Sequence, residues 1–111
     1  MGYRPRFLYV AVSIDHPNRV KVGISDHPRQ HGEELCLGSY AGSDRWRIAF
    51  AQRIWNAEKA ERMAHGVLKR RHGRAEGLVG GNGRRSREVF EAPFQHAVAL
   101  VRKFGRDFGS R

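Results

Sequence analysis

Two short runs of strand-forming residues, 7–12 and 19–24, constrain the fold of this chain more than any other feature. Both runs are rich in β-branched and aromatic residues, and the segment between them is rich in turn residues, so an antiparallel hairpin is the simplest arrangement. A one-residue slip of the pairing would bring Lys21 into the apolar face. We therefore predict the register that gathers six apolar residues on one face: Leu8, Val10, Val12, Val20, Val22 and Ile24.

The opposite face of this hairpin has a different character. In the same register it carries Tyr9 together with Lys21 and Gly23, because side chains alternate between the two faces of a strand. A phenol is therefore expected close to an ammonium. A nearby cation favours the phenolate form of a tyrosine, which can accept a proton from water.

The rest of the chain predicts further helices and one more strand. A short helix follows the hairpin, with Ser25 or Asp26 as its cap, and Asn56 caps a longer helix of about 15 residues. Pro93 opens a last helix that runs to about residue 103, and residues 105–111 form a frayed tail. Residues 46–55 alternate as a third strand, with four apolar residues predicted on one side: Trp46, Ile48, Phe50 and Ile54.

These elements predict an α+β fold, in which a small three-stranded antiparallel sheet is flanked by helices. A length of 111 residues and an apolar fraction of 40% suit a single domain over residues 1–111. One cysteine, Cys36, excludes a disulfide framework within the chain, and no apolar run approaches the ~20 residues of a membrane span. The first residues lack the apolar length of a signal peptide. We expect a cytoplasmic protein that does not bind membranes.

The charge of the chain predicts an anionic partner. There are 21 Lys and Arg against 11 Asp and Glu, a net charge of +10. Residues 69–87 combine seven of these cations with five glycines, so we predict a mobile basic loop that contacts the phosphates of a nucleic acid. The cations of this loop are Lys69, Arg70, Arg71, Arg74, Arg84, Arg85 and Arg87.

Four short segments, in this order along the chain, resemble the GIY-YIG nuclease superfamily, most of all its small, often phage-borne branch with a Lys-Ile-Gly second motif. The first two are separated by eleven residues, and the third has a Glu four residues before a His. The order and spacing of the segments are more specific than any one of them. They are Phe7-Leu8-Tyr9, Lys21-Val22-Gly23, Glu61 with His65, and Glu88-Val89-Phe90.

This resemblance implies a metal-dependent endonuclease that cleaves phosphodiester bonds, in DNA more than in RNA. It implies that Tyr9 acts as general base or orients the attacking water, with Lys21 as its partner. It also implies that Glu88 holds one Mg²⁺ or Mn²⁺, a hard cation that prefers oxygen ligands. His65 would lie at the edge of the site.

The first helix departs from the family pattern at its arginine. The family has this residue eight positions after the motif glycine, where this chain has His31, and the nearest arginine is Arg29. Arg29 could enter the site by a local shift, or a protonated His31 could replace the arginine more weakly. Catalysis could instead have been lost.

Three functions are therefore open. The first is the endonuclease, whose specificity would come from loops, from a homodimer or from a second protein. The second is a catalytically impaired nucleic-acid-binding module on the same fold. The third is a basic accessory protein that docks on an acidic protein, and only the net charge of the chain supports this function.

Overall fold

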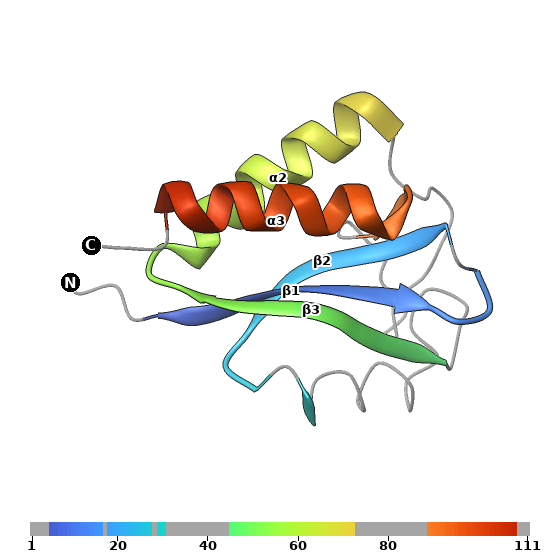
Figure 1. The fold of residues 1–111 in the computed structure, drawn as a ribbon, viewed down its shortest axis with the longest axis horizontal. Helices are drawn as coiled ribbons and strands as arrows, with labels where there is room; N and C mark the ends of the chain where they lie inside the picture. The colour runs from blue at the N-terminus through green and yellow to red at the C-terminus, as the bar shows by residue number, and fades with distance from the viewer. Residues whose placement is uncertain (1–4, 17, 28, 31–44, 73–88, 109–111) are drawn as a thin grey trace, which may run out of the picture.

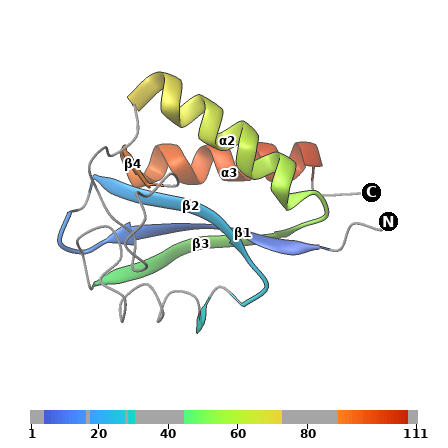
Figure 2. The same cartoon turned by 180° about the vertical axis from the view of Figure 1, so that it is seen from behind.

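The computed structural model describes residues 5–16, 18–27, 29–30, 45–72 and 89–108. It has the predicted α+β fold, with one antiparallel sheet and two helices that both lie on the same face of that sheet (Figures 1 and 2). In sheet order, the strands are β3 (Trp46–Ile54), β1 (Arg6–Ser13), β2 (Arg19–Ser25) and β4 (Val89–Glu91). The helices are α2 (Ala57–His72) and α3 (Phe94–Phe108).

The pairing of β1 with β2 confirms the predicted register. Leu8 lies opposite Ile24, and Val10 lies opposite Val22. These side chains form the core under α2 and α3, together with Ile54 and other apolar residues. Because a fully buried valine, leucine or isoleucine contributes roughly 1.5–3 kcal/mol, this layer is the main source of stability.

The prediction for the faces of β3 was wrong in part. A bulge interrupts its pairing with β1, since Val10 lies opposite Phe50 but Ala11 lies opposite Ile48. The extra residue, Ala49, reverses which face the earlier side chains occupy. Phe50 and Ile54 therefore pack into the helix-covered core, whereas Trp46 and Ile48 lie on the other face.

The sheet has four strands, where three were predicted. Val89 and Phe90 pair with Lys21 and Val20, so β4 adds an edge strand next to β2. The backbone N–H of Ala92 then donates to the carbonyl of Asn18 at 2.7 Å. A strand of three residues is too short to show an alternating pattern, and its partner is about 70 residues away in the chain, a long-range pairing that a local pattern does not report.

The 16 residues of α2 agree with the predicted helix of about 15 residues, but its last turn overlaps the predicted basic loop. α2 continues through Lys69, Arg70 and Arg71 to His72, so the start of the predicted loop is helical. Basic side chains favour the last turn of a helix, where the helix dipole is negative. The remainder of that loop, with Arg74, Arg84, Arg85 and Arg87, lies outside the described residues.

α3 continues to Phe108, so the first part of the predicted frayed tail is also helical. The carbonyl of Phe108 accepts a hydrogen bond from the backbone N–H of Asn56 at 3.2 Å. Its ring stacks on Phe104 at 6.3 Å between centroids. The hydrogen bond joins the end of α3 to the start of α2, and the ring contact lies within α3. No helix within the described residues combines the length and the apolar character needed to span a bilayer.

Candidate functional site

Tyr9 and Lys21 meet on the face of the sheet that the two helices do not cover. Tyr9 lies on β1 opposite Gly23, and Lys21 lies two residues before Gly23 on β2. The Nζ atom of Lys21 is 5.3 Å from the centroid of the Tyr9 ring, which is within the range of a cation–π contact. The predicted neighbourhood of phenol and ammonium is thus present in the structure.

Gly23 provides the space into which both polar groups extend. A Cβ atom at this position would lie 2.7 Å from the Tyr9 Oη and 3.0 Å from the Lys21 Nζ. Both distances are shorter than ordinary van der Waals contact. The glycine of the Lys21-Val22-Gly23 motif therefore allows the phenol and the ammonium to converge above the backbone.

The Tyr9–Lys21 pair is shielded from water. Tyr9 has no exposed surface, and Lys21 is 4% exposed. Charges in such surroundings interact more strongly than in bulk water, because the local dielectric constant is low.

β4 brings a third motif segment to the same part of the sheet. Val89 is buried and lies opposite Lys21 on β2. Glu88 precedes Val89 in the chain and lies outside the described residues. Within those residues, no group of three or more His, Cys, Asp or Glu side chains is arranged to hold a metal ion.

His65 lies on the helix-covered face, not beside the Tyr9–Lys21 pair. Its Nε2 donates a hydrogen bond to the carbonyl of Val22 at 2.7 Å, and its ring packs at 5.3 Å from that of Phe90 in the core. Val22 follows the last residue of β2 that pairs with β4. His65 therefore fixes the backbone between Lys21 and Gly23 from the opposite side, which is a structural role.

The segment after β2 carries the two candidates for the family arginine. Arg29 has a helical backbone conformation, and its side chain is exposed. Among the described contacts, none joins it to Tyr9 or Lys21. His31 lies outside the described residues.

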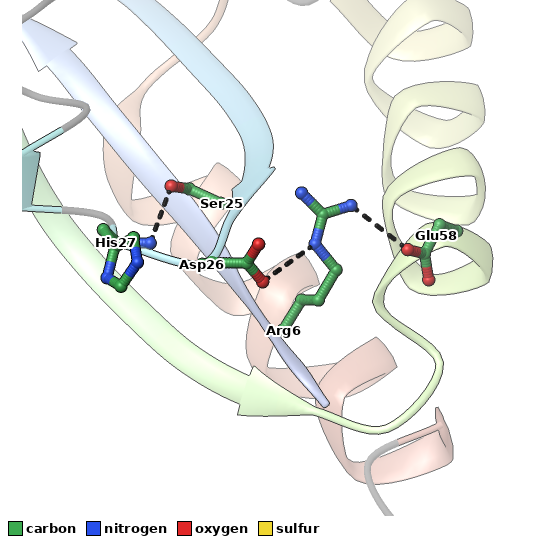
Figure 3. A network of polar contacts seen from close by, with 5 residues as sticks. All are labelled: Arg6, Ser25, Asp26, His27 and Glu58. Carbon is green, nitrogen blue, oxygen red and sulfur yellow. Dashed lines mark hydrogen bonds and ion pairs between the residues drawn. The ribbon is translucent and has the colours of Figure 1, made fainter. Parts of the chain in front are cut away.

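An ion-pair network that the sequence does not indicate holds the end of β2. The guanidinium of Arg6 lies between Asp26 and Glu58, with N–O distances of 3.3 Å to each (Figure 3). Ser25 Oγ accepts a hydrogen bond from the backbone N–H of His27 at 3.0 Å. The network ties the start of β1 and the first turn of α2 to the point where the Arg29 segment begins.

A second polar cluster joins the end of α2 to the start of α3. His72 Nε2 lies 2.6 Å from His96 Nδ1, and the Nη1 of Arg71 lies 3.3 Å from His96 Nε2. Burial, and then the nearby His72 and Arg71, hold the pKa of His96 below its ordinary value of 6.5. Sequence reasoning assigned Arg71 to nucleic-acid contact but missed both histidines, because they lie 24 residues apart on different helices.

A known protein family matches most of this chain. The family model described as the T5orf172 domain matches residues 6–105. No curated protein and no solved structure shows significant similarity to the chain. The match runs from the first residue of β1 into α3 and includes both strands of the Tyr9–Lys21 pair. The chain therefore belongs to the T5orf172 domain family, a phage-associated family that is related to nuclease-like folds.

Proposed function

We propose that this protein is an endonuclease that hydrolyses phosphodiester bonds in nucleic acid, with DNA as the preferred substrate. The observation that carries the proposal is the meeting of three motif segments on adjacent strands. Tyr9 lies opposite Gly23, and Lys21 lies opposite Val89. Membership of a family related to nuclease-like folds and a net charge of +10 support it.

The Tyr9–Lys21 pair has the chemistry that phosphodiester hydrolysis requires. The ammonium of Lys21 would neutralise charge that develops on a phosphoryl oxygen. Tyr9 would orient the attacking water and, in its phenolate form, take up the proton of that water. Because both groups converge above Gly23, one phosphate could meet both at once.

A divalent cation, Mg²⁺ or Mn²⁺, is part of the proposal, with Glu88 as its ligand. When bound, it would stabilise negative charge on the phosphate. The family resemblance of Glu88-Val89-Phe90 supports this assignment, as does the chain connectivity, since Glu88 is one residue from Val89, which pairs with Lys21. The proton and charge steps above are assigned to Tyr9 and Lys21 alone.

Nicking of a supercoiled plasmid tests the proposal. The wild-type protein should nick the plasmid with Mg²⁺ or Mn²⁺ and not with a chelator. Tyr9→Phe removes one oxygen atom, and we expect it to lower the rate by about 100-fold or more, the usual effect of losing a general base. Glu88→Gln should also abolish nicking.

Two matched measurements separate catalysis from binding. Lys21→Met should abolish nicking, whereas Lys59→Met makes the same change at an exposed position on α2 and should leave nicking within a few-fold of wild type. All variants should still bind duplex DNA. If the protein makes six or more phosphate contacts, raising the salt concentration from 50 to 200 mM should weaken that binding by on the order of 10³-fold.

The alternative functions predict different outcomes. Salt-dependent binding without nicking in either metal would refute the endonuclease and leave a nucleic-acid-binding module. Equal nicking by wild type and Glu88→Gln would point to a contaminating nuclease. Failure to bind duplex or single-stranded nucleic acid at low salt would exclude both functions in favour of an acidic protein partner.

A further inference from the structure

The Arg71–His72–His96 cluster has a hydrogen-bond pattern that determines its protonation state. Arginine can only donate, so the His96 Nε2 that faces Arg71 must accept. A neutral His96 then carries its proton on Nδ1, which donates to His72 Nε2. The network as observed therefore contains two neutral histidines.

Protonation would dismantle this network. A proton on His96 Nε2 would oppose the donor of Arg71, and a proton on His72 Nε2 would oppose the donor of His96. In the first case two like charges repel, while His96 Nδ1–H still donates to His72; in the second, two N–H donors face each other. Proton uptake at His96 therefore releases the guanidinium of Arg71, and uptake at both rings adds two imidazolium groups beside it.

The surroundings of the cluster are basic. The last turn of α2 also carries Lys69 and Arg70, both exposed, and the first turn of α3 has no acidic residue. On β4, which leads into α3, Glu91 is paired with Arg19 at 3.1 Å. Among the described residues, no carboxylate contacts Arg71, His72 or His96. The basic side chains around the cluster favour an external anion as the partner of the released donors.

We propose that Arg71, His72 and His96 form a proton-controlled contact for a backbone phosphate of nucleic acid, closed at neutral pH and open under mildly acidic conditions. Phosphate oxygens would accept from Arg71 and from both imidazolium rings as charge-assisted hydrogen bonds. The lowered pKa of His96 agrees with a closed neutral state. This inference rests on the proposed function for the identity of the ligand.

Linkage gives the size of the effect. If binding is accompanied by uptake of protons at the cluster, affinity changes by up to about tenfold per pH unit for each proton. We expect wild-type protein to bind a short labelled duplex more tightly as the pH falls from about 8 to about 5.5, the range in which histidines titrate. His72→Gln and His96→Gln should each flatten this slope.

His27→Gln is the matched control. It makes the same change on an exposed histidine at the end of β2, beside the network of Figure 3. It should keep the wild-type slope, because His27 lies outside the cluster. Fluorescence anisotropy at constant ionic strength gives all four slopes, and circular dichroism at each pH verifies that the variants are folded.

A second probe separates this inference from the proposed function. Inorganic phosphate should move the titration of the His96 imidazole resonances, followed by NMR, to a higher pH. The inference is overturned if phosphate leaves this midpoint unchanged, or if both variants keep the wild-type slope. Such a result would be compatible with normal plasmid nicking, so it would leave the proposed endonuclease function intact. Conversely, a phosphate-dependent shift of the titration midpoint in a protein that does not nick plasmid would refute the endonuclease function but not the phosphate contact.

Discussion

Gly23→Ala tests whether the convergence of Tyr9 and Lys21 requires a glycine. The new methyl group would lie 2.7 Å from the Tyr9 Oη and 3.0 Å from its Cζ, in a position where Tyr9 has no exposed surface. Carbon atoms pack best at about 3.5–4.0 Å, so the ring must move by roughly 0.5–1 Å. Lys21 Nζ, at 3.0 Å, must move as well.

The expected cost follows from two opposing effects. Extra atoms in a close-packed interior typically cost about 1–3 kcal/mol. Replacing a strand glycine by alanine returns roughly 0.5–1 kcal/mol, because glycine loses more conformational freedom on folding. We therefore expect the free energy of unfolding to fall by about 1–2 kcal/mol. Displacement of both polar groups should also reduce plasmid nicking.

Urea unfolding followed by circular dichroism measures the stability, with Gly66→Ala as the control. Gly66 lies inside α2, and a Cβ there would meet, among the described residues, the flexible end of Arg70 at 3.3 Å. This variant should be more stable than wild type by about 0.5–1 kcal/mol. If Gly23→Ala were equally stabilising and kept full nicking activity, Gly23 would not be the space that holds the pair together.

Two further variants probe the supports around these clusters. His65→Phe keeps a ring beside Phe90 but removes the donor to the Val22 carbonyl, so it should lower the free energy of unfolding by about 1–3 kcal/mol. His65→Gln should restore part of this loss. Equal stability of wild type and both variants in urea would contradict this role of His65. His96 has a lowered pKa in the folded state, so the unfolded state binds more protons and stability should decline as the pH falls below about 6.5. Thermal midpoints at about pH 7.5 and 5.5 should therefore differ more for wild type than for His96→Gln, and an identical difference would rule out this linkage.

The hairpin was predictable because its pattern is local. Alternation on both runs leaves one register that keeps Lys21 out of the apolar face, and the same register puts Tyr9 and Lys21 on one face of the hairpin. The faces of β3 were not predictable in the same way. Alternation assumes unbroken pairing, and the bulge at Ala49 leaves no mark in the apolar pattern.

Features that depend on distant contacts were missed. The end of α3 accepts a hydrogen bond from Asn56 at the start of α2, so its last turn does not follow from local propensity. The same reason hides the Arg71–His72–His96 cluster, whose members have no characteristic spacing. His65 shows the converse case, because its motif position suggested chemistry while its contacts with Val22 and Phe90 give it a structural role.

The short strand β4 links the two proposed sites. At one end, Val89 lies opposite Lys21, and at the other, Pro93 follows within two residues of Glu91 and starts the helix that carries His96. Between them, Phe90 is fully buried in the core beside His65. A strand of three residues gains little from its own hydrogen bonds, so Phe90 is the anchor that holds it in register. Loss of that anchor would therefore disturb the Tyr9–Lys21 pair and the histidine cluster together, whereas His96→Gln acts on the cluster alone.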